Sequence, residues 1–251
     1  MIADRQVQGW RVWGLGLGAI GAVTLAFGDF DVPVPKAFPE RTLLAYAAAV
    51  FLILAGAAIE WPRITARAAA VLTAYYILVV ALLIDGHMIL KYPTNYGAYN
   101  GLAEPLAIAM GGLIVAASFA QMDAARAARL IRIAQIVFGL CAIFFGIAHF
   151  VYMNMTAPLV PAWLPPSQVF WGYATGIFHI AAGVAIIAGI QARLATILLT
   201  VMFVCFTFLV HLPLAFAHPA DHFIWSENAE NLALIGAAWV IADSFRATSD
   251  R

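Results

Sequence analysis

The residues best suited to carry chemistry in this sequence are histidines and carboxylates that stand near the ends of long apolar runs. His211 closes one apolar run and Glu230 opens the next, so both are expected at the same boundary of the apolar layer, within hydrogen-bonding reach of each other. A histidine beside a carboxylate can move a proton or bind a divalent cation. Asp85 and Glu104 occupy the matching places of an earlier pair of runs, where two close carboxylates share a proton or hold a cation.

Two further histidines flank a proline-rich segment. His149 precedes and His179 follows "PLVPAWLPP", which cannot form a continuous helix because proline lacks a donor and disfavours helix at the residue before it. His179 is expected about 16 Å along a helix that starts near residue 168, close to the middle of the apolar layer. It is either a neutral histidine bonded to a neighbouring helix or a ligand and proton-transfer group. We expect His149 at a different depth, without direct contact to His179.

A third group, His218, Asp221 and His222, forms "H-x-x-D-H" in a connection between apolar runs. This group is a candidate metal site, although the spacing matches no well-defined zinc site and such residues often only meet water. The absence of C-x-x-C-H from the sequence disfavours a haem. Cys141 and Cys205 are isolated in apolar runs and are interpreted as packing residues.

The composition determines what kind of elements must position these side chains. Hydrophobic residues make up 64% of the 251 residues and charged residues only 10%, whereas soluble domains are about one quarter charged. The formal net charge is zero, which argues against nucleic acid as a partner. Eight apolar runs are long enough to cross a bilayer, which takes about 20 residues. They lie near 10–28, 41–60, 66–90, 101–122, 129–151, 168–190, 193–216 and 227–245. The sequence therefore predicts an all-α membrane protein with eight transmembrane helices.

The distribution of arginine and lysine predicts the orientation of these helices. The two ends of the chain and the even-numbered connections carry most of the basic residues: Arg5, Arg11, Arg63, Arg67, Arg126, Arg129, Arg132, Arg193, Arg246 and Arg251. The odd-numbered connections hold only Lys36, Arg41 and Lys91. Basic residues favour the cytoplasmic side, so both termini are expected in the cytoplasm of a bacterial-type inner membrane. The first run is interpreted as a retained helix, because it lacks a clear signal cleavage site.

Self-similarity predicts an internal duplication. The segment "LAEPLAIAMGGLIVAASF" at 102 aligns with "NAENLALIGAAWVIADSF" at 228, and the same shift of 126 residues pairs Arg67 with Arg193. Each half holds four expected helices, an even number, so the two halves would enter the membrane in the same direction as a parallel repeat. We expect residues 1–122 and 129–245 to form two four-helix bundles that superimpose helix for helix.

The second half also resembles a known family. "GIAHF", the proline-rich connection, "TGIFHIAAGVAIIAG" and "ARLATILL" are similar to the small four-helix DoxX-like membrane proteins. The resemblance implies association with respiratory or thiol redox systems, through relatives that belong to quinone-linked oxidoreductases. It thereby implies a quinone as cofactor and a redox protein as partner. The sequence departs from the family pattern where relatives carry a glutamate in the second helix, because His179 and Leu52 stand there.

Three classes of function fit these residues to different degrees. A quinone-linked or redox-associated membrane component would use the outer His/Glu site to handle protons, and the sequence favours this class. A scaffold or assembly partner would need no site. A transporter of small solutes or ions would need polar residues along the whole path, and the inner halves of the helices are nearly free of them apart from Glu60. Whether the protein is an enzyme, and its oligomeric state, stay open at this point.

Overall fold

The computed structural model describes residues 8–30 and 32–246, and all regular structure in these ranges is helical. Arg5 and Arg251, which are expected on the cytoplasmic side, lie outside the described residues. In chain order the elements are α1 (Gly9–Phe27), α2 (Arg41–Ile59), α3 (Thr65–Ala74), η1 (Tyr75–Asp85), α4 (Gly86–Lys91), α5 (Tyr96–Phe119), α6 (Ala124–Val151), α7 (Met153–Thr156), η2 (Ala157–Leu159), α8 (Gln168–Ala188), α9 (Ala192–Phe206), η3 (Thr207–His211), α10 (Leu212–Ala217) and α11 (His222–Ser244). Because η1 and η3 are π-helical inserts, α3 to α4 and α9 to α10 are each one continuous rod.

Seven helices in the described part of the chain are long and apolar enough to cross a membrane. They are Gly9–Phe27, Arg41–Ile59, Thr65–Lys91, Tyr96–Phe119, Ala124–Val151, Gln168–Ala188 and Ala192–Ala217. The chain is therefore a multi-pass membrane protein. The eighth expected span corresponds to α11, which is equally long but carries Glu227, Glu230 and Asp243. Its polar residues are accommodated because α11 packs against α1, α5 and α9 rather than against lipid.

Several helices begin earlier than their apolar runs. Polar side chains outside each run accept hydrogen bonds from the first free N–H groups and so set the helix start. Asn95 caps α5, Asp123 caps α6, Ser167 caps α8 and Asp221 caps α11. The expected starts at 101, 129 and 227 were therefore each five residues too late, whereas α8 begins at Gln168, where its apolar run was expected to begin.

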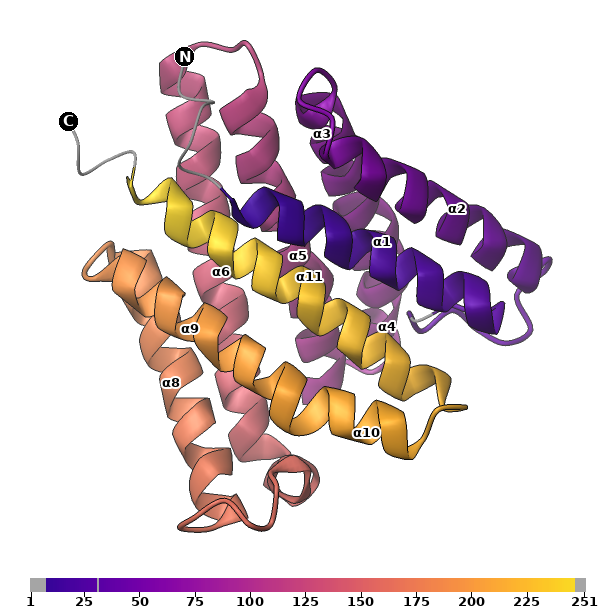
Figure 1. Ribbon diagram of the computed structural model, residues 1–251, viewed down its shortest axis with the longest axis vertical. Coiled ribbons are helices and arrows are strands. Elements are labelled where there is room, and N and C mark those ends of the chain that lie inside the picture. The colour runs from indigo at the N-terminus through magenta and orange to yellow at the C-terminus, as the bar shows by residue number, and fades with distance from the viewer. Residues whose placement is uncertain (1–7, 31, 247–251) are drawn as a thin grey trace.

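Helices α5 and α11 occupy the centre of the molecule. Figure 1 shows α11 running diagonally between α1 on one side and α9 on the other, in front of α5 and α6. Helix α1 packs on α2 and α11, whereas α6 packs on α8 and α5. Helices α5 and α11 also pack on each other. Every candidate site built on α5 or α11 is therefore enclosed by protein on most sides.

Glycines allow two pairs of helices to approach closely. A Cβ atom placed on Gly21 of α1 would lie 2.7 Å from the backbone oxygen of Ala49 on α2. A Cβ atom on Gly146 of α6 would lie 2.6 Å from the backbone oxygen of Gly176 on α8. Only a residue without a side chain fits at such crossings, the usual means by which membrane helices pack tightly. The two crossings thus use the same device at similar places in each half of the chain.

Local structure recurs at the spacing of the sequence similarity. The π-helical inserts end at Asp85 and His211, and each is followed by a six-residue helix. In the next turn, Tyr99 Oη donates to Pro93 O at 2.9 Å, and Trp225 Nε1 donates to Pro219 O at 3.0 Å. Equivalent members of these pairs are 126 residues apart in the sequence.

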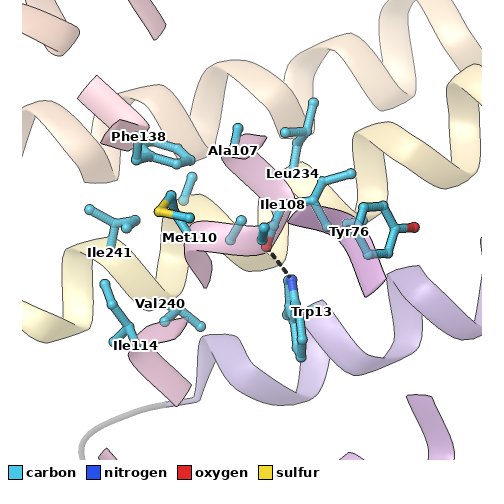
Figure 2. Packing of buried hydrophobic residues seen from close by; sticks show 14 of the residues in the cluster. Trp13, Tyr76, Ala107, Ile108, Met110, Ile114, Phe138, Leu234, Val240 and Ile241 are labelled. Carbon is cyan, nitrogen blue, oxygen red and sulfur yellow. Dashed lines mark hydrogen bonds between the residues drawn. The ribbon is translucent and has the colours of Figure 1, made fainter. Parts of the chain in front are cut away.

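The core is centred on Trp13, whose side chain is fully buried. Its Nε1 donates to the backbone oxygen of Ile108 at 2.9 Å, which ties α1 to α5 (Figure 2). At one end of α1, the Asp243 carboxylate of α11 accepts from the backbone nitrogens of Gln8 and Gly9 at 3.0 and 3.4 Å. The beginning of α1 and the end of α11 therefore lie together at one end of the bundle.

Candidate functional site

Two cavities with titratable groups in their walls lie at the contact between α5 and α11. The first, of about 390 Å³, is bounded mainly by η1, α5 and α11. The second, of about 280 Å³, is bounded by α6, α8, α9 and η3 together with α5 and α11. Both fall near the lower end of the range for small-molecule sites, about 300–1,000 Å³. Most sequence-predicted site residues line one of these two cavities.

The first cavity gathers carboxylates. Asp85, at the end of η1 and only 5% exposed, lines it with Glu104 of α5 and Glu230 of α11. A fourth carboxylate, Glu227, joins them. Glu227 lies one helical turn before Glu230, so the two share a face of α11. Glu227 is not among the predicted site residues, because the apolar run predicts a helix that starts only at 227, whereas the helix begins at His222.

Two of these carboxylates also line the second cavity. Glu104 and Glu227 border both cavities, so the α5–α11 contact forms a wall with titratable groups that face two chambers. His211, at the end of η3, lines the second cavity, whereas Glu230 lines the first. Asp85 and Glu104 thus line one cavity, and the His211 to Glu230 hydrogen bond stays a prediction.

His149 and His179 lie together at the wall of the second cavity. Their ring centroids are 5.4 Å apart, so the expectation that they would not meet was wrong. The physical reason is the glycine crossing of α6 and α8. A Cβ atom on Gly176 would lie 2.9 Å from His149 Cβ, and a Cβ atom on Gly146 would lie 3.0 Å from His179 Cβ. Each glycine makes room for the histidine of the opposite helix.

A threonine fixes the orientation of both histidines. His179 Nδ1 donates to the backbone oxygen of Thr175 at 2.9 Å. Thr175 Oγ1 donates to the backbone oxygen of Trp171 at 2.7 Å and lies within hydrogen-bonding distance of His149 Nδ1, at 3.1 Å. Because His179 Nδ1 is a donor, the neutral ring of His179 keeps Nε2 as an acceptor. His179 is the more enclosed of the two, at 2% exposure.

Aromatic rings surround His179 on several sides. The ring centroids of Phe145, Phe203 and Phe206 lie 6.1, 5.6 and 6.2 Å from that of His179. These three phenylalanines also line the second cavity. The cavity therefore combines hydrogen-bond acceptors with aromatic faces.

Asparagines of α11 hold the π-helical insert that carries His211. Asn231 Nδ2 donates to the backbone oxygen of Phe203 at 2.9 Å and to Thr207 Oγ1 at 2.7 Å. Asn228 Nδ2 donates to the backbone oxygen of His211 at 2.8 Å. A π-helical insert leaves the regular hydrogen-bond ladder, and such inserts are frequent at functional sites. The amides satisfy these backbone oxygens and so position His211.

The remaining candidates, His218, Asp221 and His222, lie at the connection between α10 and α11. The Asp221 carboxylate caps α11 by accepting from Ile224 N at 3.4 Å. The His222 ring stacks on Phe27 of α1, with centroids 4.8 Å apart. Among residues 8–30 and 32–246, no group of three or more histidine, cysteine, aspartate or glutamate residues is arranged to hold a metal ion. These contacts assign helix capping and packing to Asp221 and His222.

An apolar groove adjoins the second cavity. It has a volume of about 650 Å³, lies between α8 and α9, and is covered at one end by the connection that includes Val160 and Leu164. Val160, Thr175, Phe206 and Val210 line both the groove and the second cavity. A polar chamber and an apolar channel therefore share one wall.

Part of the chain matches a protein-family model. A family model described as "Domain of unknown function (DUF8561)" matches residues 138–240, from the middle of α6 to near the end of α11. No DoxX-like family model matches the chain. No curated protein and no solved structure matches it. The matched segment contains the two histidines of the α6–α8 crossing, His211 and both glutamates of α11.

Proposed function

We propose that this chain is a quinone-linked, redox-associated membrane component that handles protons where α5 contacts α11. The observation that carries the proposal is that Glu104 and Glu227 line both cavities. Ionisable groups within a membrane protein are costly, and they usually mark a pathway for ions or protons. Several carboxylates in one cavity cannot all ionise at once, so they share protons.

The two chambers contribute different titratable groups to the proton path. The second chamber contributes imidazoles, and the first contributes the carboxylates Asp85 and Glu230. Protons taken up at the histidines would pass through Glu104 or Glu227 to the acidic chamber. The chain itself would supply only this proton path, and a redox partner protein would supply the electron transfer.

We further propose that the chain arose by duplication of a four-helix unit, with residues 1–122 and 129–245 as parallel repeats. The proposal is supported by the glycine crossings of α1 with α2 and of α6 with α8, and by the π-helical inserts that end 126 residues apart. In this arrangement α11 is the eighth span. Both termini lie in the cytoplasm of a bacterial-type inner membrane, and the two chambers lie towards the outer side.

Infrared spectroscopy of the purified protein tests the proton-handling role. The carbonyl stretch of protonated carboxyl groups is recorded as a function of pH for the wild type, Glu104→Gln and Glu227→Gln. We expect each variant to remove part of the titrating signal and to shift the remainder, because the carboxylates share protons. Glu60→Gln is the matched control. Glu60 directly follows α2, lies beside Arg11, is partly exposed and lines neither cavity. Unchanged spectra in both cavity variants would refute proton sharing by these carboxylates and would favour a scaffold role.

A further inference from the structure

We infer that the second cavity and the adjoining apolar groove form one binding site for a lipophilic hydroquinone, with its ring in the cavity and its tail in the groove. The inference rests on the proposed function and names the class of ligand. The groove and cavity share the wall formed by Val160, Thr175, Phe206 and Val210. A ligand that occupies both spaces must be polar at one end and apolar along the rest.

The polar end of the site selects a hydrogen-bond donor. His179 uses Nδ1 as a donor to the backbone oxygen of Thr175, so the Nε2 atom of its neutral ring is an acceptor. Glu104 and Glu227 add acceptor oxygens to the same chamber. A hydroxyl group can donate a hydrogen bond to such acceptors. A carbonyl oxygen is itself an acceptor and cannot.

The charge of the chamber excludes anionic lipid head groups. Its described lining holds two carboxylates and neither lysine nor arginine, so a phosphate or carboxylate head would be repelled and would find no cation. The polar head must therefore not be anionic. The rings of Phe145, Phe203 and Phe206 favour an aromatic head, because aromatic pairs stabilise one another at centroid distances of about 4.5–7 Å.

The groove gives the tail access from the lipid. Phe178 and Leu198 line it and are 56% and 59% exposed, so they face the bilayer in a membrane-spanning bundle. The groove wall is almost entirely apolar, apart from Thr175 and Gln191, and it suits a hydrocarbon chain. A hydroquinone would enter sideways between α8 and α9, as expected for a ligand dissolved in the bilayer.

The test uses the full-length protein in nanodiscs, with its histidines labelled with ¹⁵N. The probes are a decyl-substituted hydroquinone, decanol and decanoate. We expect saturable binding of the hydroquinone together with a shift of the Nε2 resonances of His149 and His179, assigned with single variants. Decanol that binds as tightly as the hydroquinone overturns the aromatic head, and decanoate that binds more tightly overturns the charge argument.

Two variants locate the ligand. His179→Leu introduces leucine, the residue that stands at the aligned position 52. This variant should weaken hydroquinone binding about tenfold, the effect of one lost hydrogen bond in a buried site. Ala181→Phe fills the exposed groove and should weaken binding while the ligand-free histidine spectrum stays unchanged. His87→Leu, at an exposed position, is the control. Binding that neither variant weakens overturns the assignment.

The outcome is separable from that of the proposed function. Hydroquinone binding with unaltered carboxyl titration in Glu104→Gln would keep the ligand site and remove the proton-handling role. Altered carboxyl titration without hydroquinone binding would keep the proton path and overturn the present inference.

Discussion

Replacing Gly146 with alanine should destabilise the bundle and displace the histidine pair. The added Cβ atom would lie 2.6 Å from the backbone oxygen of Gly176, whereas ordinary contact begins at 3.4 Å. Helices α6 and α8 would therefore have to separate by about 0.8 Å, and a gap of that size forfeits a quarter to a half of each contact along the seam. We expect a loss of about 1–3 kcal/mol, the usual cost of overpacking a tight interface.

The assay is reversible unfolding in mixed detergent micelles, followed by circular dichroism. Gly18→Ala is the matched control because a Cβ atom at Gly18 meets nothing within 4 Å. That variant should be neutral or more stable by up to about 1 kcal/mol, because alanine favours helix over glycine. Equal stability of Gly146→Ala and Gly18→Ala would refute the close crossing. Gly21→Ala should behave like Gly146→Ala, because its Cβ would lie 2.7 Å from Ala49 O.

Two other predictions concern topology and the π-helical insert. With single cysteines at Ile64 and Leu159, an impermeant thiol reagent added to intact cells should label position 159 and spare position 64, and the reverse pattern would contradict the proposed orientation. Asn231→Leu should cost about 1–3 kcal/mol in the same unfolding assay, because Phe203 O and Thr207 Oγ1 lose the donor they share. An unfolding free energy equal to that of the wild type would show that these amide contacts do not hold the insert.

Much of the fold could be predicted because apolar length alone identifies membrane helices. Seven of the eight expected runs correspond to helices that meet that criterion, and the eighth corresponds to α11. The helix starts were less accurate, because caps such as Asn95 and Asp221 lie outside the apolar run and are satisfied only once the helix forms. The π-helical insert η3 carries no local signal that we recognised, since it is held by amides donated from α11.

The site could be predicted residue by residue but not as an arrangement. The residue types of His149 and His179 were informative, yet their contact depends on how closely α6 and α8 cross, which the depth of each residue alone does not give. Glu227 was missed because its helix starts one turn earlier than its apolar run. The pairing of a polar cavity with an apolar groove depends on the fold of the outer connection around Val160, which has no periodic pattern.

The central position of α11 has a consequence for how the protein is made. This helix is too polar to rank among the candidate spans, because its carboxylates and asparagines are accommodated by other helices rather than by lipid. During synthesis α11 emerges after α10, whereas its main neighbour α1 emerges before α2. Insertion of α11 should therefore depend on helices that are already assembled in the bilayer, so truncation or misplacement of α1 would strand the end of the chain outside the membrane.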